Sequence, residues 1–115
     1  MPVPALMARL NAPLAGFFAR MVSADDTQVR ADLEALPAQL PPGTRAVVLE
    51  MHRLISLDNS GLDALQQLHR TLQRQGIGLV FANVNEQPLS LMQRSGFEAL
   101  IGSDNIVPTI SEAVF

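Results

Sequence analysis

Two short apolar runs without polar alternation stand out along the chain. They are Ala46–Leu49, which continues as an extended segment to Met51, and Ile77–Val84. A strand that is apolar on both faces is typical of a buried position in a parallel sheet, whereas a half-exposed strand alternates. We therefore predict that Ala46–Met51 and Ile77–Val84 are neighbouring inner strands joined by a right-handed crossover helix.

The residues between these runs have the apolar spacing of an amphipathic helix. Its inner face consists of Leu62, Leu65, Leu68 and Leu72. Gly76 closes this helix, and we expect the leucine stripe to pack against the sheet rather than to form a partner groove. An earlier helix is predicted after the capping segment Ser23–Asp26, and Pro37 ends or kinks it. The apolar positions of that helix are Val29, Leu33 and Leu36.

Weaker patterns complete the arrangement of the chain. The turn Pro41–Gly43 precedes the first apolar run. Further extended segments are predicted at Ala5–Leu10, Pro13–Phe18 and Ile106-Val107. A further helix is predicted from a cap at Asn85, with Pro88 in its first turn, Leu89 and Met92 on its inner face, and a stop at Gly96-Phe97. A capping box from Thr109 to Glu112 predicts the start of a last helix. Strands alternating with helices predict an α/β fold with a central mixed, mostly parallel sheet and packed helices.

Composition narrows the class of protein and the kinds of site that the chain can hold. The 115 residues suit one domain, with 48% hydrophobic residues but no Trp and no Tyr. Few aromatic residues and a net charge of −3 argue against nucleic-acid binding. The absence of cysteine excludes disulfides and thiol catalysis. No apolar run reaches the length of a membrane span, and we expect a cytosolic polypeptide.

The segment Asp58-Asn59-Ser60-Gly61-Leu62 has the strongest functional signal, because it opens the leucine helix. A hydroxyl and unpaired backbone N–H groups at a helix N-terminus favour negative charge. Three interpretations stay open for this place: a phosphoserine switch, an anion contact, or a plain helix cap at Ser60. Asp58 is expected to brace the loop by accepting backbone N–H bonds, and Gly61 to leave the backbone open to close approach.

Other chemistry-bearing residues do not assemble into a recognisable catalytic or metal site. Asp58 has no His, Lys or second carboxylate beside it, so general-base catalysis is not expected. His52 and His69 do not have the spacing of a ligand pair, and we predict neither a metal nor a cofactor. Arg70 and Arg74 lie on one helix face, where solvation is the expected role.

The ordered set of segments resembles the STAS domain, from about Ala5 to the end of the chain and best over Arg45–Gly102. That domain is shared by bacterial anti-sigma-factor antagonists and the cytosolic C-terminal tails of SulP-type anion transporters. The segments that carry the resemblance are Ala46–Met51, Leu57–Leu62, the following helix, Gly76 and Asn83-Val84. Those that resemble the transporter branch are Phe17-Phe18, Gln87-Pro88-Leu89 with Met92, Ser95-Gly96-Phe97, and Gly102–Thr109.

The resemblance implies that residues 1–115 form a STAS domain, a non-enzymatic regulatory and interaction domain of a SulP-type anion transporter. Its expected partners are the transmembrane domain of its own transporter at the cytoplasmic face of the membrane, a soluble cytosolic protein, or a second protomer, and not nucleic acid. The alternative is a free-standing antagonist-type switch. In that branch the serine before this glycine accepts a phosphate from a kinase, and Ser60 aligns with it.

Overall fold

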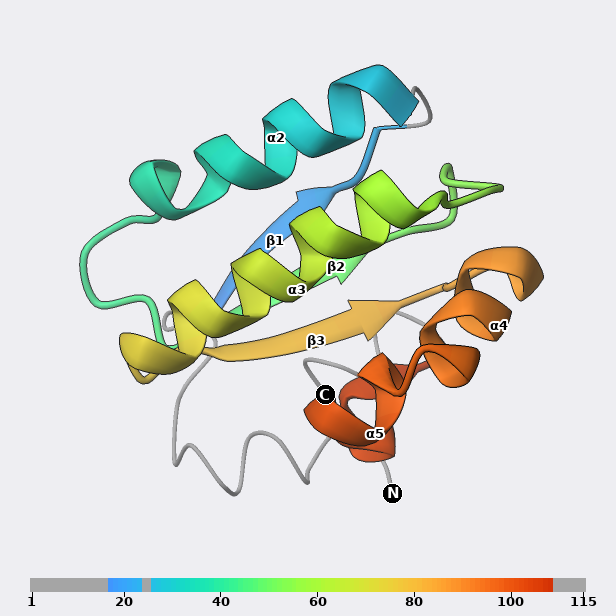
Figure 1. Ribbon diagram of the computed structural model, residues 1–115. Coiled ribbons are helices and arrows are strands. Elements are labelled where there is room, and N and C mark those ends of the chain that lie inside the picture. Colours follow the sequence, from blue (N-terminus) through green and yellow to red (C-terminus); the bar gives the residue numbers. More distant parts are fainter. Residues whose placement is uncertain (1–16, 24–25, 109–115) are drawn as a thin grey trace.

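Strands and helices alternate in the computed structural model of the chain, which describes residues 17–23 and 26–108 (Figure 1). The elements are β1 (Phe17–Met21), α2 (Asp26–Gln39), β2 (Ala46–Glu50), α3 (Asn59–Arg74), β3 (Gly78–Ala82), α4 (Glu86–Arg94), α5 (Phe97–Ile101), the 3₁₀ turn η2 (Ser103–Asn105) and β4 (Ile106–Val107). None of these helices is long and apolar enough to cross a membrane. The α/β class predicted from the sequence is confirmed.

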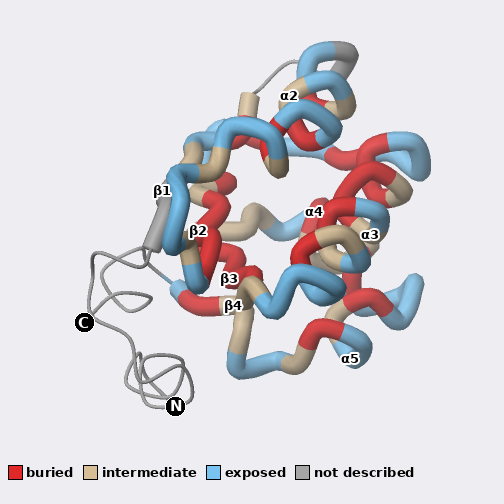
Figure 2. The backbone as a smooth tube through the Cα atoms, turned by 90° about the vertical axis from the view of Figure 1, so that its left-hand side faces the viewer, coloured by how far each residue is buried: buried red, intermediate tan, exposed pale blue. Residues whose placement is uncertain are grey.

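The sheet has the order β1-β2-β3-β4, and every strand pairing within the described ranges is parallel. In the pairing of β2 with β3, Val47 lies opposite Leu79 and Leu49 lies opposite Phe81. Because parallel crossovers are right-handed, a sheet that grows in one direction carries all its crossover helices on the same face. Figure 2 shows the described helices together on one side of the sheet.

Both faces of β2 and β3 are buried, which explains why their sequences lack polar alternation. Successive strand residues point to opposite faces. Val47, Leu49, Leu79 and Phe81 belong to the core cluster that includes the helix side chains, and their exposed fractions are 5% or less. The intervening residues Ala46, Val48, Val80 and Ala82 are 0–1% exposed. The prediction that these two strands are inner neighbours is confirmed.

The leucine stripe of α3 packs as predicted. Its four leucines, Leu62, Leu65, Leu68 and Leu72, have exposed fractions of 7% or less. They belong to the same core cluster as Val29, Leu33 and Leu36 of α2, the residues whose spacing predicted that helix. Gly76 follows α3 with a φ of +73°, a left-handed conformation that glycine adopts without steric penalty.

Three local predictions have mixed outcomes. The strand expected at Pro13–Phe18 overlaps β1, which continues to Met21, and residues 13–16 lie outside the described part of the chain. Pro37 does not end α2, because the loss of one ladder bond in the final turn leaves the buried leucine face intact. The predicted stop at Gly96 is confirmed, because α4 ends at Arg94; the sequence did not predict that a new helix, α5, begins at Phe97, which is 1% exposed. A φ of +83° at Gly96 turns the chain, and burial of Phe97 favours a new helical segment. The predicted elements at Ala5–Leu10 and Thr109–Glu112 lie outside the described residues.

Replacing Leu68 with alanine should lower the free energy of unfolding by about 2–5 kcal/mol, the cost of a cavity at a buried leucine. Leu68 is 3% exposed and lies in the middle of α3. Urea unfolding of both proteins measures the difference. Leu100→Ala is the matched control, because Leu100 is 62% exposed and should change stability by less than about 0.5 kcal/mol. Equal effects of the two substitutions would contradict the assignment of the stripe to the core.

Candidate functional site

The candidate segment Asp58–Leu62 lies where the chain returns from the carboxyl edge of the sheet to the helix layer. β2 ends at Glu50 and α3 begins at Asn59, so residues 51–58 form the connection. In a parallel sheet the connections that follow each strand gather at the same edge, which is where open α/β sheets bind ligands. Residues 83–85, after β3, therefore lie beside this connection.

Asp58 caps the start of α3. Its backbone is extended, with φ −99° and ψ −179°, and one carboxylate oxygen accepts the Gly61 N–H at 2.8 Å. Its carbonyl oxygen accepts the N–H of Leu62 at 2.9 Å, which is the first bond of the helix ladder. The expectation that Asp58 braces the loop is confirmed. With Asp58 in this role, Ser60 is the second residue of the helix, and the plain-cap interpretation of Ser60 is wrong.

The Ser60 hydroxyl is exposed and accepts a hydrogen bond from a neighbouring helix. The donor is Nη1 of Arg30 on α2, at 3.0 Å. The same guanidinium contacts Glu34 at 3.3 Å and Asp63 at 4.0 Å. These side chains are about half exposed, so their ion pairs add little to stability. Ser60 is thus the neutral member of a polar cluster between α2 and α3.

Gly61 lies close to a side chain inside the molecule. A Cβ atom at this position would lie 2.6 Å from Cδ1 of Leu57, so a larger residue would require the Leu57 side chain to shift. Leu57 itself is 4% exposed and belongs to the core cluster. We expected Gly61 to leave the backbone open to close approach. The structure shows that this approach is made by Leu57, and that Gly61 and Leu62 are buried while residues 58–60 are exposed.

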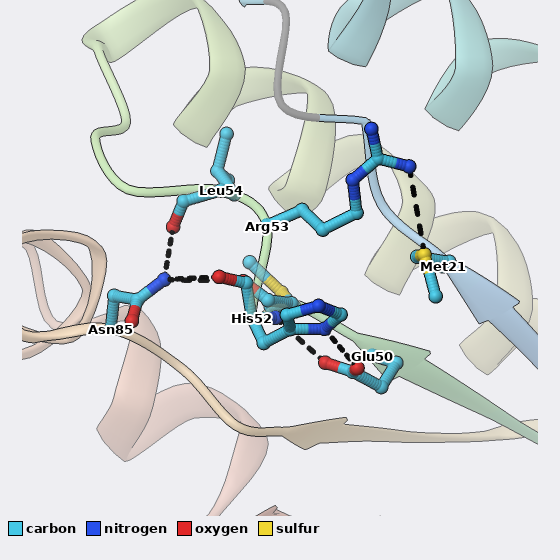
Figure 3. Close-up of polar contacts among 7 residues, drawn as sticks. Met21, Glu50, His52, Arg53, Leu54 and Asn85 are labelled. Carbon is cyan, nitrogen blue, oxygen red and sulfur yellow. Dashed lines mark hydrogen bonds and ion pairs between the residues drawn. The ribbon is translucent and has the colours of Figure 1, made fainter.

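Two side-chain amides at the start of α4 fix the connection between β2 and α3. Nδ2 of Asn85 donates to the carbonyl oxygens of His52 at 2.9 Å and Leu54 at 2.8 Å, with a longer contact of 3.5 Å to that of Met51 (Figure 3). Asn85 occupies the N-cap position of α4 but makes no side-chain cap bond, contrary to expectation. Its amide donates to the neighbouring loop instead and thereby satisfies the carbonyl groups of the buried residues Met51 and Leu54.

The second amide, that of Gln87, binds the backbone of Leu57 with both of its polar atoms. Oε1 accepts the Leu57 N–H at 2.6 Å, and Nε2 donates to the Leu57 carbonyl at 3.0 Å. This pairing imitates a strand ladder at a residue that belongs to no strand. The sequence offers no local signal for it, because the two partners are thirty positions apart.

The remaining titratable groups near this edge pair locally. His52 Nδ1 contacts the Glu50 carboxylate, which also accepts the His52 backbone N–H at 2.6 Å (Figure 3). Arg53 lies beside the sulfur of Met21 on β1.

His69 lies about three turns further along α3, edge-on to Phe97. Burial lowers the pKa of the His69 imidazole, and the adjacent Arg70 acts in the same direction.

The described residues do not contain a group of three side chains able to hold a metal ion. The Asp58 carboxylate caps the helix by accepting the Gly61 N–H. The Ser60 hydroxyl is bonded to the Arg30 guanidinium, whereas a nucleophilic serine needs a neighbouring base. The exposed part of the segment therefore consists of residues 58–60, with the Asp58 carboxylate bonded to the Gly61 N–H and the Ser60 hydroxyl bonded to Arg30.

Comparisons with known proteins agree on one family. The model of the STAS domain matches residues 6–113. Sulfate transporter 1.3 of Arabidopsis thaliana is 36% identical over 81 residues, which is 70% of this chain and 12% of the transporter, so the chain spans about an eighth of that relative.

Solved structures show the same fold at low sequence identity. A sulfate transporter family protein from Wolinella succinogenes superimposes with a TM-score of 0.81 at 18% identity, covering 90% of this chain and 85% of that one. The STAS domain of a SulP transporter from Vibrio cholerae gives a TM-score of 0.76 at 13% identity, covering 96% and 91%. Matched over nearly its whole length and sharing this architecture, the chain belongs to the STAS domain family.

Proposed function

We propose that the chain is a non-catalytic regulatory and protein-interaction domain of a SulP-type anion transporter. The observation that carries the proposal is the match to a sulfate transporter whose length is about eight times that of the matched part. A domain without a membrane-crossing helix among its described residues would serve such a protein from the cytoplasmic side. Its partners would be the transmembrane domain, a second protomer or a soluble cytosolic protein.

Within this function, we assign Asp58–Leu62 as the segment through which the domain communicates. Its exposed part comprises Asp58, Asn59 and Ser60, at the positive end of a sixteen-residue helix. The segment is held from behind by the packing of Leu57 on Gly61. A partner would therefore meet a surface of fixed shape. A phosphate on Ser60 would change its charge without requiring the helix to move.

Arg30 would extend the effect of a phosphate on Ser60 from the start of α3 to neighbouring charged side chains. The guanidinium is shared among the Ser60 hydroxyl, Glu34 and Asp63. A dianionic phosphate on Ser60 would compete with both carboxylates for the same cation. The cluster already holds two carboxylates and one guanidinium, so the phosphate would make the surface between α2 and α3 strongly acidic.

The gene that encodes this chain provides the first test of the transporter assignment. Upstream codons in the same reading frame should encode many apolar spans, as expected for a transporter whose tail is this domain. Sequencing the locus from the source genome is the measurement. A short, separate reading frame next to a kinase gene would contradict the assignment.

Ser60→Asp should leave the unfolding midpoint within about 2 °C of the parent, because acidic groups are tolerated at a helix start. The same variant should alter transport by the full-length protein several-fold, whereas Ser60→Ala should not imitate it. Radiolabelled sulfate uptake and phosphate mapping by mass spectrometry provide the readouts.

Ser103→Asp is the matched control for Ser60→Asp, because Ser103 is exposed on η2 at a distance in sequence from the α3 start. It should leave uptake unchanged. If Ser60→Asp and Ser103→Asp behave alike, and Ser60 from the native host carries no phosphate, the role of this segment in communication is refuted.

The purified chain should hydrolyse nucleotides and phosphate esters no faster than its Asp58→Asn variant. Asparagine is an effective helix cap, so this substitution removes the carboxylate while keeping the start of α3 stable. Phosphate release measured over several hours provides the test. A rate that depends on Asp58 and survives repeated purification would show that the domain is an enzyme.

A further inference from the structure

A hollow of about 570 Å³ opens beside the connection between β2 and α3. It is lined by Ile55, Asn85, Glu86, Gln87 and Ser90. Ile55 comes from the connection after β2, and the other four residues come from the start of α4. The hollow therefore lies between two segments that the Asn85 and Gln87 amides join.

Ile55 is held outward by the way its neighbours are anchored. Leu54 is 1% exposed and Leu57 is 4% exposed, whereas Ile55 is 73% exposed. The Leu54 carbonyl and the Leu57 backbone are the groups that Asn85 and Gln87 bind. A single exposed apolar side chain is ordinary on a protein surface. Here the exposed side chain lines a hollow, and the backbone on either side of it is hydrogen-bonded to α4 residues.

The charge of the hollow is negative. Glu86 is its one ionisable lining residue, and within the described ranges Glu86 takes part in none of the ion pairs. The remaining lining groups are two amides and one hydroxyl, which bear no charge. A ligand that fits would place an apolar side chain against Ile55 and a cation near Glu86.

We propose that this hollow is the docking site for a lysine- and arginine-rich cytoplasmic loop of the transporter's membrane domain, a proposal that rests on the function proposed above. Cytoplasmic loops of membrane proteins carry an excess of Lys and Arg, because those residues determine which side a loop occupies. Such loops also carry apolar residues where they leave the membrane. Their chemistry therefore complements both Ile55 and Glu86.

An anionic lipid surface is the other charged partner that a cytoplasmic domain of a membrane protein would meet. The hollow is not complementary to such a surface. The cytoplasmic leaflet has a negative surface potential and attracts clusters of Lys and Arg. The hollow contributes a carboxylate and no cation. Glu86 would be repelled by the lipid, so a protein loop of opposite charge is the occupant that the site favours.

A peptide titration of the ¹⁵N-labelled chain tests the proposal. The probe is a nine-residue peptide in an alanine background, with a central leucine and two lysines on each side of it. Binding should move the amide resonances of Ile55, Glu86 and Ser90 most. A peptide with glutamates in place of the lysines, and one with serine in place of the leucine, should each bind at least tenfold more weakly.

Variants of the chain then separate the two contacts. Ile55→Ser should weaken binding of the lysine peptide about tenfold, because an apolar contact is lost. Glu86→Gln should weaken it about threefold and reduce its dependence on salt. Leu100→Ser and Asp104→Asn are matched controls, since both residues are exposed and lie outside the hollow. They should change binding by less than twofold.

Several outcomes would overturn the docking site: resonance shifts that map elsewhere, equal binding of the glutamate peptide, or a loss of binding in the controls equal to that in Ile55→Ser. Binding to phosphatidylserine vesicles that Ile55→Ser abolishes would also overturn it in favour of a lipid. The transporter assignment is judged separately, by the gene and by the Ser60 variants. The transporter assignment can be correct even if the docking site is refuted. Conversely, binding of the lysine peptide alone does not support the transporter assignment if the gene contradicts it.

Discussion

Parallel pairing of β2 with β3 is the constraint from which the rest of the described structure follows. Parallel neighbours need a crossover, and the right-handed crossover places α3 on one face of the sheet. Repeating the same step from β1 to β4 brings the other helices onto that face and leaves every returning connection at one edge. The candidate site is therefore not an independent feature. It is the place where the chain leaves β2 and enters α3.

That edge creates a problem of hydrogen bonding that the chain solves with side chains. Residues 51–57 are neither strand nor helix, yet Met51, Leu54 and Leu57 are buried and bring their backbone groups out of water. Buried backbone polar groups are costly without partners. Asn85 and Gln87 provide the donors and the acceptor. The start of α4 is thus part of the loop's structure, although it follows the loop by about thirty residues.

The elements that depend on periodicity could be predicted from the sequence, and those that depend on distant contacts could not. Periodicity identifies the apolar runs of β2 and β3 and the leucine stripe of α3, because the spacing of apolar residues in each segment defines the face that is buried. Helix α5 has no comparable signal: it is short, and it forms where Phe97 finds the core.

The same division holds within the site. The bracing role of Asp58 was predictable from local cap chemistry, whereas the cap itself was expected at Ser60 and lies at Asp58. The bond from Arg30 to Ser60, and the pairing of Gln87 with Leu57, join residues thirty positions apart and leave no local pattern. Gly61 was singled out correctly for its missing side chain. The group that uses the space is Leu57, which only the packed structure identifies.

Leu57 also bears on how the proposed regulatory function could work. Its side chain packs on Gly61 at the start of α3, and its backbone is bound by Gln87 at the rim of the hollow. The Ser60 surface and the hollow are therefore two sides of one fixed body. Transmission by movement would require a second arrangement of these contacts. In the proposed function, a change of charge at Ser60 would need none, because it would alter the field that a docked partner meets. Electrostatic control of docking therefore fits the proposed function better than a conformational switch.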